Sequence, residues 1–383
     1  MDLGLFEKML AVDSTSGKER EFAQRLMEWL KTPGNRVESH EVGDGTLNLL
    51  FRWDRKPEGG EESLPSLCLC SHLDTVPPYI PPSFVDLPGG DVRIEGRGSC
   101  DAKGQVFSMF EACKALEKEG YTDFGLLLLA GEETGSFGAK AWDRDCPGGD
   151  VVIVGEPTGG VQASAAKGTA SYEVTIYGKP CHSGYPEAGR SAVEMFMDFM
   201  EELRGEDFPS DPVLGPTTYN VGKLLSDNPQ NILSPELTFR IYFRTTFVSK
   251  EAVDAFMARE REGFETVARG GDEPMEYTLW DGIPSAPVSF GSDAPRLHKF
   301  KRRSLLGPGS ILTAHTPGEQ VLLPKGGVHG FRRCVCLFFQ GLQLCFRRSF
   351  SQNAVQRKNI ADLVCRENAG QKGQAKQESD CLQ

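Results

Sequence analysis

The pattern of apolar and polar residues changes along this chain. In residues 1–165, short apolar runs such as FGLLLL (124–129) and DVVIVG (150–155) alternate with helical patterns such as residues 101–120. Continuous apolar runs are typical of strands buried on both faces, and helices between them favour a mostly parallel α/β sheet. Residues 1–165 are therefore interpreted as the first part of an α/β domain.

A different rhythm runs through residues 166–277. Stretches such as 168–178 and 237–246 alternate between apolar and polar residues, as in a sheet with one solvent-exposed face. The order β-α-β-β-α-β predicts a ferredoxin-like α+β domain whose last strand lies within 275–283. Because α/β signals resume at 278–323, this domain is interpreted as an insertion. Its first predicted helix presents an apolar face made of Val193, Phe196, Met197, Met200 and Leu203.

The last stretch, residues 324–383, has a different composition. It contains 10 Lys and Arg against 4 Asp and Glu, and 5 of the 11 Cys, whereas the residues before it carry a net charge of −18. Pro324 and the glycines after it break any helix there. We interpret residues 324–383 as an atypical basic, Cys-rich tail, disordered at its end. One hypothesis is that it derives from a different reading frame or a fusion.

Composition also limits the partners and the location. The net charge of −12 argues against nucleic acid, and no apolar run approaches the ~18 residues of a membrane span. The first residues show no signal peptide, and the cysteines show no disulfide-framework spacing. We therefore expect a cytoplasmic protein that binds neither nucleic acid nor membrane.

Five potential metal ligands each follow an apolar strand or a turn. They are His72, Asp101, Glu133, Glu156 and His315. Because binding sites in open α/β sheets collect at the carboxyl ends of strands, residues this far apart can converge in one crevice. Two histidines and three carboxylates suit two divalent cations such as zinc or cobalt, with Asp101 as the bridging carboxylate.

Two further carboxylates suggest catalytic roles. His72 and Asp74 are two residues apart on an extended chain, so Asp74 can orient the His72 imidazole. Glu132 and Glu133 place like charges side by side, and a bound cation would offset their repulsion. Glu133 would then bind the cation, and Glu132 would act as the general base that takes a proton from metal-activated water.

Five motifs in this chain resemble one enzyme family. SHLDTVP, GRGSCDAKG, AGEETGS, VGEPT and AHTPGE occur in the order and spacing of the acetylornithine deacetylase and succinyl-diaminopimelate desuccinylase family. These enzymes are di-metal amidohydrolases and exopeptidases, and the resemblance covers roughly residues 1–323. It implies that His72 and Glu156 hold one cation, that Glu133 and His315 hold the other, and that Asp101 bridges them. The implied catalytic pair is Asp74 and Glu132.

The resemblance extends to the inserted segment. It implies that residues 166–277 form a lid domain through which two chains dimerise. His182 would help to stabilise the oxyanion, often in the partner's active site, and Asn231 and Arg244 would bind the substrate carboxylate. Arg240 is a near competitor for the role of Arg244. Arginine suits a carboxylate because its guanidinium donates two parallel hydrogen bonds.

Three functions follow as hypotheses. The first is hydrolysis of the amide of an N-acyl amino acid such as N-acetylornithine, with Glu132 as general base. The second is a dipeptidase or carboxypeptidase on the same scaffold, because acyl and peptidyl amides need the same catalytic groups. The third is a catalytically inactive metal-binding protein, which the altered C-terminal stretch motivates.

Overall fold

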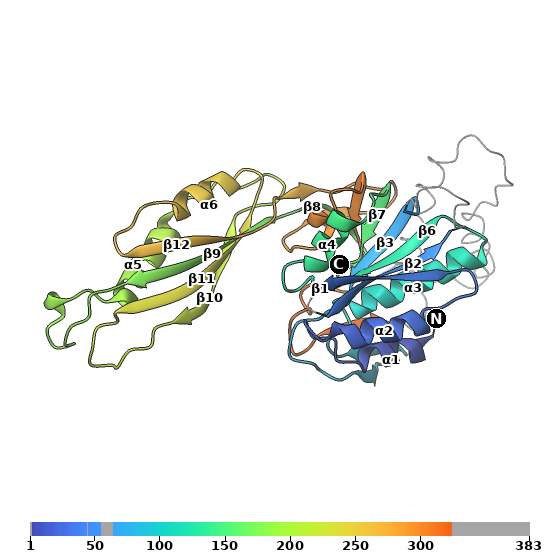
Figure 1. Cartoon of the computed structure of the whole chain (residues 1–383), viewed down its shortest axis with the longest axis horizontal. Coiled ribbons are helices and arrows are strands. Elements are labelled where there is room, and N and C mark those ends of the chain that lie inside the picture. Colours follow the sequence, from blue (N-terminus) through green and yellow to red (C-terminus); the bar gives the residue numbers. More distant parts are fainter. Residues whose placement is uncertain (1, 44, 55–63, 324–383) are drawn as a thin grey trace, which may run out of the picture. The chain divides into compact units, whose positions relative to one another are not determined.

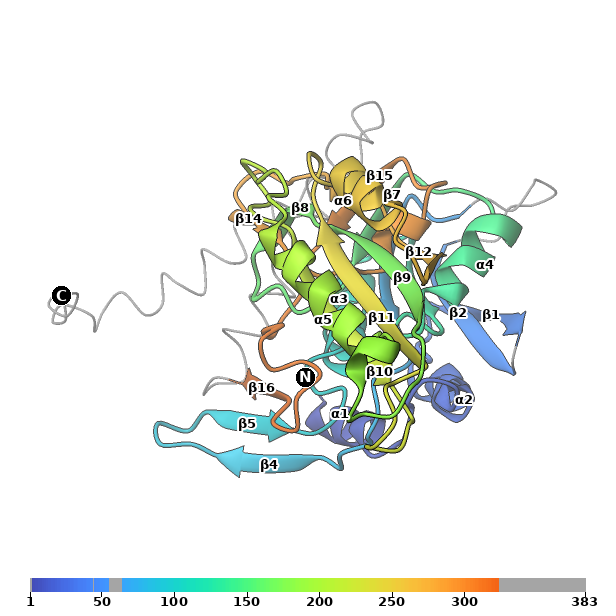
Figure 2. The same cartoon turned by 90° about the vertical axis from the view of Figure 1, so that its left-hand side faces the viewer.

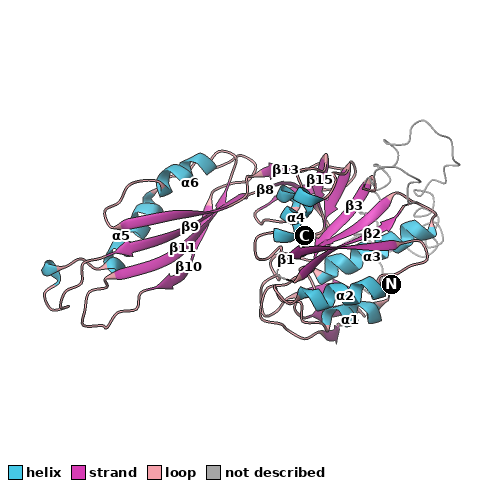
Figure 3. Cartoon of the chain, in the orientation of Figure 1, coloured by secondary structure: helices cyan, strands magenta, loops and turns pink. Residues whose placement is uncertain are grey.

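The computed structural model describes residues 2–43, 45–54 and 64–323 (Figure 1). The predictions made for the tail 324–383 lie outside these residues. The helices of the α/β part are α1 (Leu3–Leu10), α2 (Glu19–Trp29), α3 (Lys103–Lys118) and α4 (Phe137–Asp145), with a short 3₁₀ helix η2 (Ala294–Arg296). Figure 3 shows the helices and strands of this part.

A six-stranded sheet forms the centre of the α/β part. Its order is β1 (Arg36–Gly43), β2 (Thr46–Trp53), β6 (Phe124–Leu129), β3 (Leu67–His72), β7 (Val151–Val154) and β15 (Arg302–Leu305). The last four strands of this order are mutually parallel, and β1 and β2 pair antiparallel at one edge. Every residue of β3, β6 and β7 is buried, as their continuous apolar runs predict.

Helices cover both faces of this sheet. Helices α1, α2 and α3 lie together on one face, and α4 lies on the other (Figures 1 and 2). Two small sheets flank it, of orders β13 (Met275–Glu276), β8 (Gln162–Ala166), β14 (Ser285–Val288) and β16 (Gln320–Leu323), β5 (Val92–Glu95), β4 (Ser83–Asp86).

The inserted part is a four-stranded antiparallel sheet with two helices on one face. Its elements in chain order are β9 (Gly168–Tyr177), η1 (Pro186–Ala188), α5 (Ala192–Gly205), β10 (Thr218–Leu225), β11 (Glu236–Thr245), α6 (Lys250–Met257) and β12 (Phe264–Gly270). The apolar residues of α5 and α6 pack on the inward residues of β9 and β11. An α/β fold with an inserted α+β domain is therefore confirmed.

Two details of the predicted inserted domain are wrong. Its last strand is β12, and of residues 275–283 only Met275 and Glu276 form a strand, which pairs with β8 in another sheet. Of the predicted apolar face of α5, Met197 is wrong, because it is 57% exposed, whereas Val193, Phe196, Met200 and Leu203 pack on the core together with Met195 and Phe199. Among the helices of the described ranges, none combines the length and apolar character needed to cross a bilayer.

Candidate metal centre

Three neighbouring parallel strands carry potential ligands at one end. His72 is the last residue of β3, Glu132 and Glu133 follow β6, and Glu156 follows β7. Because β6, β3 and β7 are adjacent and parallel, their carboxyl ends meet at one edge of the sheet. Asp101 reaches this edge from the turn before α3. The three strands thus bring together side chains that lie far apart in the sequence.

The Asp101 carboxylate lies between two histidines. Its Oδ1 is 3.0 Å from His72 Nε2, and its Oδ2 is 3.4 Å from His315 Nε2. The same His315 nitrogen is 2.9 Å from Glu133 Oε1. His315 takes a backbone φ of +61°, which is uncommon for a residue with a side chain. A carboxylate with one oxygen facing each histidine has the arrangement that a bridging metal ligand requires.

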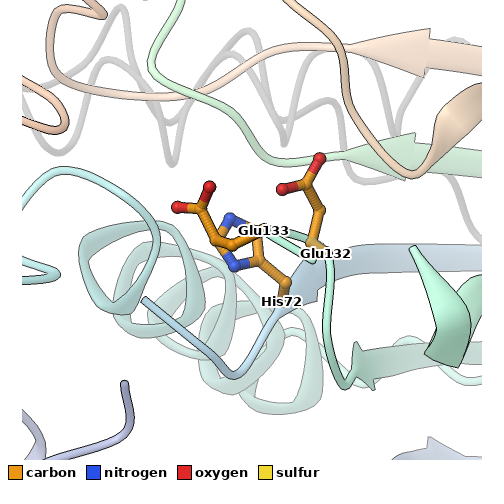
Figure 4. A group of neighbouring side chains, drawn as sticks. All are labelled: His72, Glu132 and Glu133. Atoms are coloured by element: carbon orange, nitrogen blue, oxygen red, sulfur yellow. The ribbon is translucent and has the colours of Figure 1, made fainter. Parts of the chain in front are cut away.

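Three groups of ligand atoms are compact enough to hold a cation. In each group the atoms lie within 4.8 Å of one another: His72–Asp101–Glu156, Asp101–Glu133–His315, and His72–Glu132–Glu133. The first two groups share Asp101. Figure 4 shows the third group, in which the two glutamates extend from adjacent positions near the His72 ring.

Two carboxylates of the cluster lie close to other negative charges. Glu156 is 3% exposed, and its Oε1 accepts no hydrogen bond within the described part of the chain. Burial, together with the neighbouring Asp101 carboxylate, raises the pKa of Glu156 well above its usual value. Burial and the nearby Asp293, Glu133 and Asp101 carboxylates raise the pKa of Glu132 in the same way. Divalent cations would supply the missing positive charge, so the donor set fits a metal centre.

The histidines respond to the same negative charge. Hydrogen bonds with Asp101 and Glu133 raise the pKa of His315 to about 10. Burial disfavours the charged form of His72, but its hydrogen bonds with Asp101 and Asp74 raise its pKa well above 6.5. Without metal, the surrounding carboxylates therefore favour the protonated form of both imidazoles. A cation must displace these protons, because only a neutral imidazole nitrogen binds metal.

Asp74 connects the cluster to the β6–α4 turn. Its carboxylate accepts hydrogen bonds from the backbone N–H groups of Glu132 (3.0 Å) and Glu133 (3.3 Å) and from the Ser16 hydroxyl (2.8 Å). His72 Nδ1 lies 2.9 Å from the Asp74 backbone oxygen and 3.4 Å from its Oδ1. Asp74 thus fixes both the His72 ring, leaving Nε2 facing Asp101, and the backbone of the two glutamates.

The predicted substrate-binding residues lie in the inserted domain, outside the three ligand groups. His182 and Asn231 are exposed and belong to adjacent loops: Ser183 N–H donates to the Asn231 backbone oxygen at 3.0 Å, and His182 pairs with Ile232 in an isolated bridge. Within the described ranges, no hydrogen bond or ion pair joins these two residues to the metal ligands.

Arg244 and its competitor Arg240 have different surroundings. Arg240 is held by Glu173, with an Nε–Oε2 distance of 2.9 Å. Arg244 forms no ion pair with any described residue, and its guanidinium stacks on the Tyr242 ring at 4.9 Å. Gly291 lies beside the Arg244 guanidinium. Arg240 is therefore held in an ion pair, whereas Arg244 has no ion-pair partner among the described residues.

Two buried acids near the cluster were not predicted from the sequence. Asp293 is 1% exposed, and neither of its carboxylate oxygens has a hydrogen-bond partner in the described part of the chain. Burial raises the pKa of Asp293 to about 7. Glu319 is also 1% exposed and is surrounded by hydrogen-bond donors. Glu319 closes the AHTPGE motif, which was the only signal in the sequence that pointed to it.

Sequence comparisons identify similar proteins. The family model described as "Peptidase dimerisation domain" (M20_dimer) matches residues 164–272. A peptidase M20 domain-containing protein of Schizosaccharomyces pombe is 30% identical over 343 residues, spanning 87% of this chain and 84% of that protein. A probable carboxypeptidase of Aspergillus clavatus is 30% identical over 368 residues, spanning 86% and 87% of the two chains.

Solved structures share the fold at lower identity. A tripeptidase of Staphylococcus aureus superposes with a TM-score of 0.71 at 19% identity, covering 90% of this chain and 98% of that one. An M20 family metallo-carboxypeptidase of Sulfolobus solfataricus superposes with a TM-score of 0.63 at 16% identity, covering 90% and 99%. These proteins have the same α/β domain with the same kind of insertion.

Proposed function

This chain belongs to the M20 peptidase family, and from that premise we propose that it is a di-metal exopeptidase that releases the C-terminal residue of short peptides. The observation that carries the proposal is the Asp101 carboxylate, which faces His72 with one oxygen and His315 with the other. The name of the related probable carboxypeptidase of Aspergillus clavatus is our reason for proposing a peptide, rather than N-acetylornithine, as the substrate. A deacylase, the function predicted first from the sequence, would use the same residues. It is the alternative outcome of the test below.

The proposed ligand sets share one residue. His72 and Glu156 would hold one cation, Glu133 and His315 the other, and Asp101 both. Bound zinc or cobalt would activate a water molecule and polarise the scissile carbonyl.

Side chains of this chain would carry out proton transfer, positioning and oxyanion stabilisation. Glu132 accepts a proton from the attacking water and returns it to the leaving amine. Burial and the neighbouring carboxylates raise the pKa of Glu132 above its usual value, which favours binding of a proton by this side chain. Asp74 keeps the His72 ring and the backbone of Glu132 in place through the hydrogen bonds described above. We also propose that His182 helps to stabilise the oxyanion that forms at the scissile carbonyl.

Substrate orientation is assigned to the inserted domain. Arg244 would bind the C-terminal carboxylate of the peptide through its guanidinium, with Asn231 as a second donor. The partnering of Arg240 with Glu173 supports the choice of Arg244. The match of residues 164–272 to a dimerisation domain supports a homodimer formed through this part of the chain.

A substrate panel tests the proposal. The purified chain is stripped with chelator, refilled with Co²⁺ or Zn²⁺, and given dipeptides, a tripeptide, the matching C-terminal amides, N-acetylornithine and N-succinyl-diaminopimelate. We expect metal-dependent release of the C-terminal residue from peptides, and at least about tenfold slower release from the amides, because they lack the charged partner of Arg244. Release from N-acetylornithine without release from peptides would instead assign a deacylase.

A further inference from the structure

The Glu319 carboxylate accepts four hydrogen bonds. Its Oε1 accepts from the backbone N–H groups of Gly98 (3.0 Å), Cys100 (3.1 Å) and Asp101 (2.9 Å). Its Oε2 lies 2.6 Å from Arg97 Nη1. All of these donors belong to one short loop, residues 96–101, which ends at the proposed bridging ligand.

Strand pairing brings Glu319 to this loop. Strand β16 pairs antiparallel with β5, with Gln320 opposite Glu95, so Glu319 lies opposite Gly96. Gly96 N–H donates to the Glu319 backbone oxygen at 3.0 Å, which continues the strand pairing by one residue. The loop then turns through Gly96 and Gly98, whose φ angles are +134° and +84°. Such angles suit glycine and let successive N–H groups point inward at one anion.

The Arg97 side chain extends this arrangement. It is 2% exposed, and its Nε donates to the Pro78 carbonyl oxygen at 3.2 Å. Glu319 and Arg97 thus form a buried ion pair that also bonds to backbone groups through Glu319 Oε1 and Arg97 Nε. Such a pair costs desolvation, but it sets a specific geometry when its hydrogen bonds are satisfied.

We propose that Glu319 is a positioning residue of the metal centre, which fixes the 96–101 loop so that the Asp101 carboxylate stands between His72 and His315. Glu319 touches neither histidine, and it acts through the Asp101 backbone. Asp101 belongs to both proposed ligand sets, His72–Asp101–Glu156 and Asp101–Glu133–His315. Glu319 therefore controls the binding of both cations. The segment 315–319 therefore has two tasks: His315 supplies a ligand, and Glu319 positions the ligand that both cations share. This inference rests on the proposed di-metal site.

Cobalt binding to the full chain tests the inference. The parent and Glu319→Gln are stripped, and Co²⁺ is titrated against a competing chelator while its visible spectrum is recorded. Glutamine keeps the shape but loses the charge and turns a donor toward Arg97. We expect at least about tenfold weaker binding of both cobalt ions, because loss of a group that orients a ligand typically weakens metal affinity by 10–100-fold.

The matched control is Asp54→Asn, which weakens the ion pairs of Asp54 with Arg52 and Arg36, outside the ligand groups. It should lower the unfolding temperature and leave cobalt affinity within about twofold of the parent. Cobalt affinity of Glu319→Gln within twofold of the parent would overturn the inference while leaving the proposed function intact. A parent chain that binds no cobalt would overturn both.

A second variant decides the matter if Glu319→Gln does not fold. Arg97→Lys keeps a positive charge near Oε2 but loses the guanidinium that joins Glu319 to Pro78. We expect at least about threefold weaker cobalt binding, a smaller effect because the three backbone donors remain. Unchanged cobalt binding in Arg97→Lys would then overturn the inference.

Discussion

Replacing Glu132 by glutamine should lower kcat by about 10³-fold while both cations stay bound, because the amide cannot accept a proton and the proposed ligand sets do not include it. The proposed base lies half-buried beside His72, and its backbone N–H is fixed by Asp74. The substitution keeps the side-chain volume, so the geometry of the cluster should persist. The measurement is kcat on the best substrate of the panel, with the metal content of the same sample.

A matched control is Glu21→Gln, an identical chemical change at an exposed ion pair with Arg25. It should leave kcat within about twofold of the parent, as surface substitutions rarely matter. Unreduced kcat in Glu132→Gln would remove Glu132 from the role of general base. Loss of a bound cation in that variant would instead make Glu132 a ligand, as the compact group His72–Glu132–Glu133 would allow.

Replacing Asp101 by asparagine should remove at least one of the two cations and lower kcat by about 10³-fold or more. Asparagine has a single, uncharged oxygen. It therefore cannot offer one anionic oxygen to each of the two proposed cations. The hydrogen bonds that hold the pKa of Asp101 below its usual value, despite its burial, show how strongly His315 and His72 interact with its charge. Metal content per chain and kcat are measured together.

Asp54→Asn again serves as the control, since it makes the same change outside the cluster. Two tightly bound cations in Asp101→Asn would contradict the bridging role. One bound cation with much reduced turnover would support it, because the remaining groups can still form one partial site.

The local parts of the fold could be predicted from the sequence. The buried strands β3, β6 and β7 have continuous apolar runs, and their carboxyl ends locate His72, Glu133 and Glu156 without any knowledge of distant contacts. Strand β12 could not be predicted in this way. Nearly all of its residues are exposed, so it shows no apolar period, and its conformation depends on pairing with β9.

Long-range contacts explain the other omissions. The hydrogen-bond donors of Glu319 belong to a loop more than 200 residues earlier in the chain. Asp293 is buried, although the residues next to it in the sequence do not predict this. The exposure of Met197 on α5 has a related cause. Methionine and phenylalanine occur around much of that helix, so contact with β9 and β11 decides which of them are buried.

The choice between acyl and peptidyl substrates could not be made from the motifs. All five motifs describe ligands and catalytic acids, which serve either amide. The groups proposed to bind the substrate, such as Arg244, lie in the inserted domain, where Glu173 pairs with Arg240 and Arg269. Short sequence motifs do not show which arginine has an acidic partner.

The most direct test of the central claim is a titration of the stripped parent chain with Co²⁺ while dipeptide hydrolysis is followed. We predict no turnover without metal, two tightly bound equivalents per chain, and turnover that reaches its maximum as the second equivalent binds. Undiminished hydrolysis by the stripped chain, or fewer than two equivalents bound at saturation, would contradict a di-metal centre formed around Asp101.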